Sequence, residues 1–139
     1  MKSFEWTHDS RTFHGLKTEV NNPQFGLLII HGMGEHIGRY DPFLKTLEAE
    51  GIYALGIDLR GHGKSLKNKS IGLLEPGDTF SAMIDDLHGL YMQELQAFPN
   101  LTWTLMGHSM GSVLARRYAQ VYPMDFDRMI WMGTLPLYN

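Results

Sequence analysis

The chain has 139 residues, of which 43% are hydrophobic and 19% charged, with a formal net charge of −3 and no cysteine. This balance is typical of one globular domain over residues 1–139 and excludes a chain that is disordered throughout. The lack of cysteine excludes disulfide scaffolds, zinc–thiolate sites and cysteine nucleophiles. No block of lysine and arginine stands out, so we expect no nucleic-acid partner.

The apolar runs are too short for a membrane protein. The longest purely aliphatic run covers residues 27–30, far below the roughly 20 residues that a bilayer crossing needs. The charged N-terminal segment has no apolar core of the signal-peptide kind. We therefore expect no transmembrane segment and a cytoplasmic location.

The first third of the chain predicts three strands and a helix. Two short strands at 4–7 and 12–19 surround a polar turn. The continuous apolar run at 25–30 shows no alternation, which is typical of a strand buried on both faces. Apolar side chains then recur at helical spacing over 40–50, and Gly51 is a natural end for this helix.

The same alternation of strands and helices continues to the end of the chain. We predict a buried strand at 52–57, a glycine-punctuated loop at 59–77, an amphipathic helix at 80–98, a strand at 101–106, a helix at 110–121 and a buried strand at 128–132. This order implies an α/β fold, with a mainly parallel sheet covered by helices on both faces. Ligands bind beyond the carboxyl ends of such strands, where the loops at 31–36, 58–65 and 107–111 converge.

The most specific motif is GHSMG at residues 107–111, a G-x-S-x-G between a predicted strand and a predicted helix. This spacing places a serine on a sharp, strained turn with its hydroxyl lifted above the sheet. The helix N-terminus beneath it favours a developing oxyanion. Ser109 is therefore the candidate nucleophile, and the alternative is a turn whose serine merely caps the helix.

A second glycine-rich motif, HGMGEH, occupies residues 31–36 directly after a buried strand. Acyl transfer needs two backbone N–H groups aimed at the carbonyl oxygen. The N–H of Met110 follows the nucleophile, and the N–H of Met33 lies in the earlier loop. We expect the two methionine side chains to line an apolar acyl pocket. A phosphate-binding loop is disfavoured, because the P-loop lysine and the G-x-G-x-x-G spacing are both missing.

The third motif, DLRGHGKS at residues 58–65, has two interpretations. Asp58 could be a catalytic carboxylate and His62 a base. We favour the other interpretation, in which these polar groups lock a glycine-rich turn.

HGMGEH, DLRGHGKS and GHSMGS, in this order and spacing, resemble the motifs of the α/β-hydrolase superfamily. The first and third together resemble its monoacylglycerol lipase and lysophospholipase branch, over about residues 3–135. The resemblance implies Ser109 as nucleophile and the amides of Met33 and Met110 as the oxyanion hole. It also implies a small carboxylic-ester or lipid substrate, with no metal or organic cofactor.

The sequence departs from that pattern after the serine. In this fold the catalytic triad of nucleophile, acid and base follows the chain order Ser, then Asp or Glu, then His. All seven histidines of this chain precede Ser109. The acids that follow are Asp125 and Asp127, before the last predicted strand and so at the end remote from the site. His108 should point away from the hydroxyl, and we disfavour His31 and His36 as bases.

The resemblance implies relatives of about twice this length, with a lid and further strands that carry the acid and the base. We therefore expect an N-terminal half of a hydrolase, nearly inactive alone. The strand at 128–132 would form an open edge suited to self-association or to pairing with a C-terminal half. The alternatives are another serine-using branch (a thioesterase, peptidase or C–C hydrolase) and a non-catalytic binding or regulatory protein.

Overall fold

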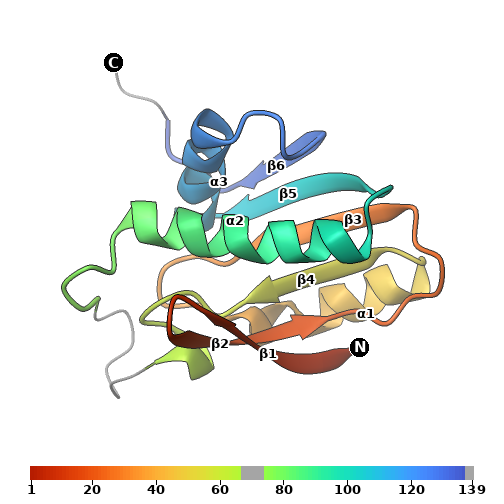
Figure 1. Ribbon diagram of the computed structural model, residues 1–139, viewed down its shortest axis with the longest axis horizontal. Helices are drawn as coiled ribbons and strands as arrows, with labels where there is room; N and C mark the ends of the chain where they lie inside the picture. The colour runs from red at the N-terminus through yellow and green to blue at the C-terminus, as the bar shows by residue number, and fades with distance from the viewer. Residues whose placement is uncertain (67–73, 137–139) are drawn as a thin grey trace.

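A computed structural model describes residues 1–66 and 74–136 of the chain. Six strands in this part form one sheet in the order β1-β2-β4-β3-β5-β6 (Figure 1). The strands are β1 (Lys2–His8), β2 (Arg11–Lys17), β3 (Phe25–Ile30), β4 (Tyr53–Ile57), β5 (Thr102–His108) and β6 (Arg128–Met132). The helices are α1 (Asp41–Ala49), α2 (Phe80–Ala97) and α3 (Met110–Val121), with short 3-10 helices η1 (Ile37–Tyr40) and η2 (Gly63–Ser65).

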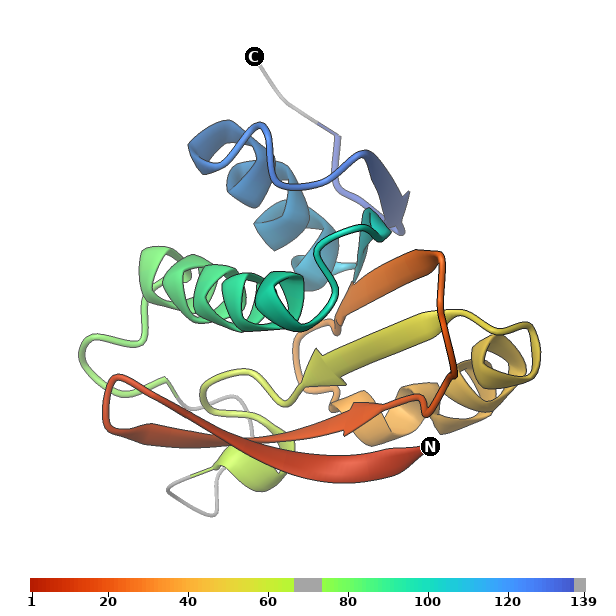
Figure 2. The same ribbon diagram turned by 45° about the vertical axis from the view of Figure 1, so that its right-hand side comes forward.

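The sheet is parallel over β4, β3, β5 and β6, whereas β1 and β2 form an antiparallel hairpin joined to β4 (Figure 2). Leu28 of β3 pairs with Leu55 on one side and Leu105 on the other, and all three side chains are buried. The apolar run at 25–30 therefore forms a central strand, as predicted. The mainly parallel sheet confirms the predicted α/β fold class.

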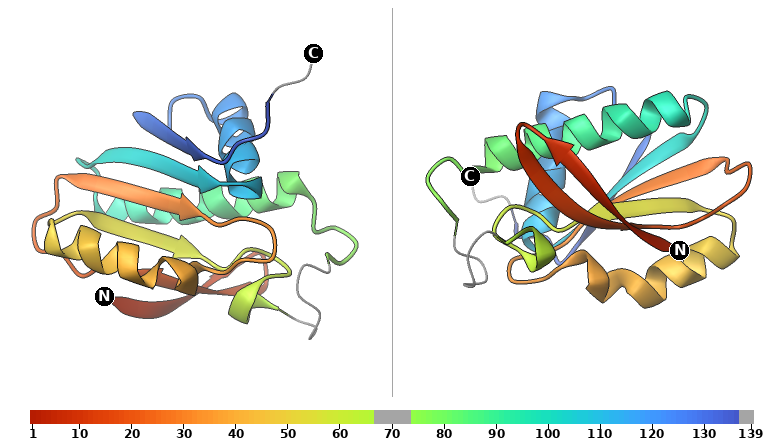
Figure 3. Two further views of the ribbon diagram at one scale, coloured as in Figure 1. Left: turned by 180° about the vertical axis from the view of Figure 1, so that it is seen from behind. Right: turned by 60° about the horizontal axis from the view of Figure 1, so that its bottom comes forward.

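Helices cover both faces of the sheet (Figure 3). On one face α1 buries Leu44 and Leu47 against Leu27 and Ile29 of β3. On the other face α2 and α3 pack over a larger core that contains Trp103 of β5. Burial of this apolar surface is the main force that holds the layers together.

Local signals explain where the helices begin and end. The Thr79 hydroxyl accepts a hydrogen bond from the Ala82 N–H at 3.1 Å and so caps the start of α2. At the end of α1, Gly51 has φ +72°, and the Ile52 N–H bonds back to the Leu47 carbonyl at 2.9 Å. The predicted helix over 40–50 is thus α1, preceded by the single turn of η1.

Two predictions need correction. β5 runs two residues further than the predicted strand at 101–106, because its pairing continues to His108 opposite Met132. The strand at 128–132 exists as predicted but is not buried: Ile130 and Trp131 are 44% and 50% exposed. Among the described residues β6 has a strand neighbour on one side only, which agrees with the predicted open edge. Part of the predicted loop at 59–77, residues 67–73, lies outside the described residues.

Candidate active site

Ser109 lies on the sharp turn between β5 and α3, with φ 53° and ψ −118°. Positive φ is uncommon and strained for any residue with a Cβ atom. Its N–H donates to the Met132 carbonyl at 2.9 Å, which ties the turn to β6. The side chain is exposed, and its hydroxyl has no hydrogen-bond partner within residues 1–66 and 74–136. We call residues 107–111 the Ser109 elbow.

The two glycines of the elbow are required by close backbone contacts. A Cβ on Gly107 would lie 2.1 Å from the Gly111 carbonyl oxygen. A Cβ on Gly111 would lie 2.2 Å from the Ile30 oxygen at the end of β3. Real side chains never approach backbone so closely, so the first turn of α3 packs against two strand ends only with glycine at both positions.

The HGMGEH loop lies beside the elbow. A Cβ on Gly32 would be 3.2 Å from the His108 carbonyl oxygen, which places this loop against the end of β5. The Met33 N–H has no acceptor among the described residues, and Met110 begins α3, where the first N–H groups lack partners within the helix. The Met33 side chain is 55% exposed. The Met110 side chain packs in the larger core, and the acyl pocket stays a prediction.

Glu35 joins the two loops, and the sequence analysis missed it. Its Oε2 atom accepts hydrogen bonds from the Gly32 N–H at 2.6 Å, from Tyr40 at 3.3 Å and from His108 Nδ1 at 3.2 Å. Arg39, four residues on, forms an ion pair with its other oxygen. Burial raises the pKa of Glu35, but the bonds from Gly32 and His108 outweigh it and lower the pKa below its ordinary value.

No histidine side chain forms a hydrogen bond with the Ser109 hydroxyl within the described part of the chain. His108 turns toward Glu35, as its predicted orientation requires. His31 is fully buried: its Nδ1 bonds the Gly32 carbonyl at 2.8 Å, and its Nε2 accepts from the Leu59 N–H at 3.0 Å. Burial is the main cause that lowers the pKa of His31 to about 4. Its imidazole is therefore neutral and structurally engaged.

Residues 58–65, which we call the Asp58 turn, show the structural arrangement that we favoured. One carboxylate oxygen of Asp58 accepts from the Ile37 N–H at 2.7 Å, and the other accepts from the Lys64 N–H at 2.8 Å. His62 Nδ1 bonds the Arg60 carbonyl at 2.8 Å, and the His62 side chain is buried. His62 Nε2 has no hydrogen-bond partner among the described residues, but burial keeps both Asp58 and His62 from a substrate.

An ion-pair network anchors the Asp58 turn to the neighbouring helix. The guanidinium of Arg60 forms two hydrogen bonds with the Asp86 carboxylate of α2, at 2.6 and 2.9 Å. Asp78 accepts from Arg11 of β2 at 2.9 Å and lies 3.4 Å from Arg60. Planar two-point contacts of this kind fix orientation as well as charge.

The two acids after the serine lie at the opposite end of the sheet, as predicted. Asp127 precedes β6 and accepts from the Trp103 N–H at 2.9 Å. Asp125 accepts from the Tyr118 hydroxyl at 2.7 Å and lies 2.9 Å from His88 Nδ1. Both carboxylates hold the connection between α3 and β6, so neither can orient a base at the Ser109 elbow.

The described residues contain no cluster of three histidine, aspartate or glutamate side chains that could hold a metal ion. None of the helices in residues 1–66 and 74–136 is both long and apolar enough to cross a membrane.

A mainly parallel sheet with helices on both faces, and a serine at a strained strand-to-helix turn, define an α/β hydrolase. Residues 21–138 match the family described as serine aminopeptidase, S33. The chain therefore belongs to this hydrolase family.

Named lipases are among the relatives. Over 131 residues the chain is 28% identical to a monoacylglycerol lipase of Mycolicibacterium smegmatis, covering 94% of this chain and 45% of that one. Over 116 residues it is 31% identical to a monoglyceride lipase homolog of monkeypox virus, covering 84% and 40%. A solved soluble variant of the Saccharomyces cerevisiae monoglyceride lipase, bound to a substrate analog, shares the fold at a TM-score of 0.80 and 22% identity, covering 98% and 45%. The chain thus spans less than half the length of these relatives.

Proposed function

We propose that this chain carries the nucleophile and oxyanion hole of a serine hydrolase for carboxylic esters of the monoacylglycerol or lysophospholipid type. The conformation of Ser109 supports this most directly: φ is positive, the side chain is exposed and the hydroxyl has no partner among the described residues. Strain of this kind costs about 1–3 kcal/mol and persists where function needs it. The lipase names of the relatives support the substrate class.

In the proposed reaction the Ser109 Oγ attacks the ester carbonyl carbon and the alcohol leaves with a proton. Water then hydrolyses the acyl-enzyme and restores the serine. The backbone N–H groups of Met33 and Met110 donate to the oxyanion, and the N-terminus of α3 adds a favourable dipole. The Met33 N–H supports this role, because it lies beside the elbow and has no acceptor among the described residues.

The Ser109 hydroxyl also needs a general base, and no histidine follows it in this chain. Loss of the base in such sites lowers the rate by about 10⁴-fold or more. We therefore propose that the 139-residue chain alone hydrolyses esters at close to the background rate.

Labelling with a fluorophosphonate probe tests the nucleophile. We expect slow covalent labelling that is lost in Ser109→Ala and kept in Ser81→Ala, a matched change at an exposed serine of α2. Addition of a polypeptide that carries the C-terminal half of a relative should accelerate the labelling. An absence of labelling under both conditions would favour a non-catalytic binding protein instead. Fast turnover of p-nitrophenyl esters by the chain alone would contradict the proposal that the chain lacks a general base.

The family description leaves a second substrate class, since it names an aminopeptidase. Paired ester, thioester and aminoacyl-anilide substrates with the same acyl group separate the classes once a base is supplied. We expect the ester to be cleaved with the highest kcat/KM. Preference for the anilide would favour a peptidase.

We also propose that the open edge at β6 takes part in self-association or in pairing with a C-terminal half. Ile130, Trp131 and Met132 are all between 44% and 50% exposed, and such edges pair readily with other strands. Trp131→Lys should shift sedimentation toward the monomer, whereas Met92→Lys, at an exposed apolar position on α2, should not. A monomer that binds no apolar dye before any substitution would contradict this.

A further inference from the structure

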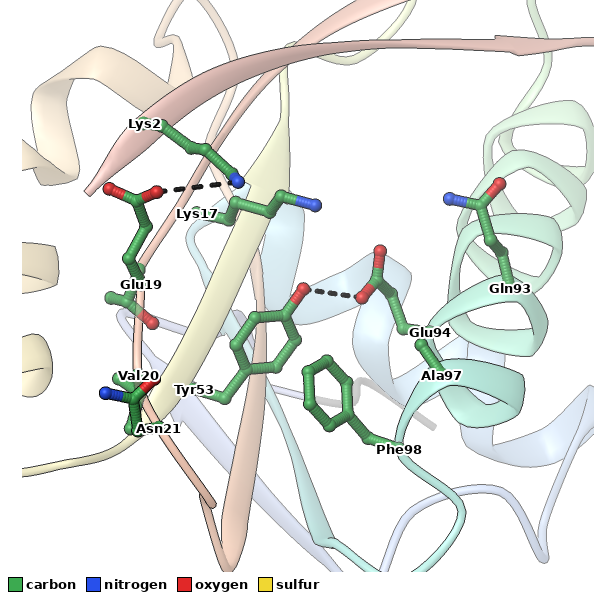
Figure 4. A pocket seen from close by; sticks show the side chains of 11 residues that line it. Lys2, Lys17, Glu19, Val20, Asn21, Tyr53, Gln93, Glu94, Ala97 and Phe98 are labelled. Atoms are coloured by element: carbon green, nitrogen blue, oxygen red, sulfur yellow. Dashed lines mark hydrogen bonds and ion pairs between the residues drawn. The ribbon is translucent and has the colours of Figure 1, made fainter.

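A hollow lies at the amino end of the parallel strands, the opposite end from the Ser109 elbow (Figure 4). This cavity of about 530 Å³ is formed by β1, the end of β2 and the segment after it, the start of β4 and the C-terminal end of α2. The side chains that matter here are Lys17, Tyr53, Glu94 and Phe98. The proposed hydrolysis uses none of them.

Glu94 lines this cavity although it is a charged residue type and only 4% exposed. The Tyr53 hydroxyl donates to its Oε2 at 2.5 Å, and no cation pairs with the carboxylate within residues 1–66 and 74–136. Its other oxygen has no described donor and points into the space between the Lys17 and Gln93 side chains (Figure 4). Burial and then Glu94 raise the pKa of Tyr53, so its hydroxyl stays protonated. Buried charges are normally paired, and this one is paired only with a neutral hydroxyl.

The cavity also holds an unpaired cation. Lys17 of β2 lies directly opposite Lys2 of β1, and like charges placed opposite each other on one face destabilise a strand pair. Glu19 lies 3.5 Å from Lys2, but Lys17 has no carboxylate partner in the described part of the chain. Its ammonium instead lies 5.0 Å from the centre of the Phe4 ring. One unpaired ammonium and one unpaired carboxylate thus line the same cavity without contacting each other.

We propose that this cavity binds a small amino carboxylate, whose ammonium donates to Glu94 and whose carboxylate accepts from Lys17. The Phe98 ring, packed 4.5 Å from the Tyr53 ring between centroids, forms an apolar wall for the methylene groups between the two charges. Charge-assisted hydrogen bonds are stronger than neutral ones, and a zwitterion completes both at once. A ligand with a single charge leaves one protein group unpaired, so both charges are needed for recognition.

Titration of the ¹⁵N-labelled chain with three probes tests this by NMR. The probes are γ-aminobutyrate, n-butylamine and butyrate, which share a four-carbon chain and differ in their charges. We expect γ-aminobutyrate to shift the amide signals of residues around Lys17, Tyr53 and Glu94 and to bind at least about tenfold more tightly than either singly charged probe. Equal affinity for butylamine or butyrate, or no shifts at these residues, would overturn the proposal.

Substitutions distinguish binding in the cavity from non-specific electrostatic binding elsewhere on the surface. Glu94→Gln keeps the shape and an acceptor for Tyr53, and Lys17→Met keeps the stem of a half-buried side chain. Each substitution should raise the dissociation constant for γ-aminobutyrate by at least about tenfold. Lys45→Met, on α1 and paired with Asp41, is the matched control and should bind unchanged. Binding that survives Lys17→Met would show that the lysine is no ligand and would refute the site.

A Ser109→Ala variant should bind the probe as tightly as the parent chain, because the cavity lies at the other end of the sheet. Binding at this cavity is therefore independent of the proposed hydrolysis. Loss of binding in this variant would place the probe at the hydrolytic site and overturn the inference.

Discussion

Two glycine-rich turns lie at the same rim of the sheet and use their polar groups in opposite ways. In the Asp58 turn both carboxylate oxygens accept backbone hydrogen bonds, and the side chain is 2% exposed. In the Ser109 elbow the hydroxyl has no partner among the described residues, is exposed and stands on a strained backbone. Both turns present motifs of catalytic residue types in the sequence, yet only one of them leaves such a group available.

This contrast distinguishes a structural polar residue from a functional one. A buried carboxylate whose bonds are complete within the chain is explained by the fold alone. A strained residue whose hydroxyl has no partner is not explained by the fold alone, and binding of a substrate would explain it. Removal of the buried carboxylate should lower the stability of the fold. Removal of the strained residue's hydroxyl should abolish the proposed reaction. Substitutions at glycine, histidine, aspartate and serine positions of the two turns and the loop between them test that division.

Gly111→Ala should lower the free energy of unfolding by at least about 3 kcal/mol, because the new Cβ meets the Ile30 oxygen at 2.2 Å. Gly51→Ala is the control: its φ is +72°, but nothing lies within 4 Å of the new atom. This change should cost only about 1 kcal/mol. Urea denaturation measures both, and equal losses would show that the elbow is not held by close packing.

His31 joins the two regions, since its ring accepts from Leu59 of the Asp58 turn and its carbonyl lies close to Gly111. Its pKa is about 4 in the folded chain and about 6.5 when unfolded, so protons bind the unfolded state first. The free energy of unfolding should therefore be highest above pH 6.5 and fall by up to about 3 kcal/mol toward pH 4. Urea denaturation at several pH values measures this dependence. The free energy of unfolding should change less with pH in His31→Gln than in the parent chain, and as much as in the parent chain in His36→Gln.

Asp58→Ala should lower the free energy of unfolding by about 2–3 kcal/mol, because it leaves the N–H groups of Ile37 and Lys64 without acceptors. Asp41→Ala, which removes an exposed ion pair on α1, should change it by less than about 1 kcal/mol. Thermal or urea denaturation measures the difference. At temperatures where Asp58→Ala stays folded, fluorophosphonate should still label Ser109. Lost labelling in a folded variant would assign the Asp58 turn to the chemistry.

Ser109→Gly should have the opposite sign and raise the free energy of unfolding by about 1 kcal/mol, since glycine adopts positive φ without strain. Ser109→Ala keeps the Cβ atom and should change stability by less than about 0.5 kcal/mol. Both variants should lose the proposed reactivity. A destabilised Ser109→Gly would mean that the serine supports the fold.

Local patterns predicted the order of strands and helices well. The apolar run at 25–30, the helix at 110–121 and the strand at 128–132 have the predicted bounds in the structure. Predictions failed where the outcome depended on neighbours in space. The length of β5 follows from its pairing with β6, and the exposure of Trp131 follows from the missing neighbour beyond β6 in the described residues.

Sequence patterns alone predicted the alternation of strands and helices, and two glycines at fixed spacing marked Ser109. Those signals are local, because periodicity and turn chemistry act over a few residues. Only the folded structure shows that Glu35 of the HGMGEH loop binds His108, and that Glu94 and Lys17 line one cavity. These contacts join residues far apart in the chain, so they depend on how the layers pack, which no local pattern specifies.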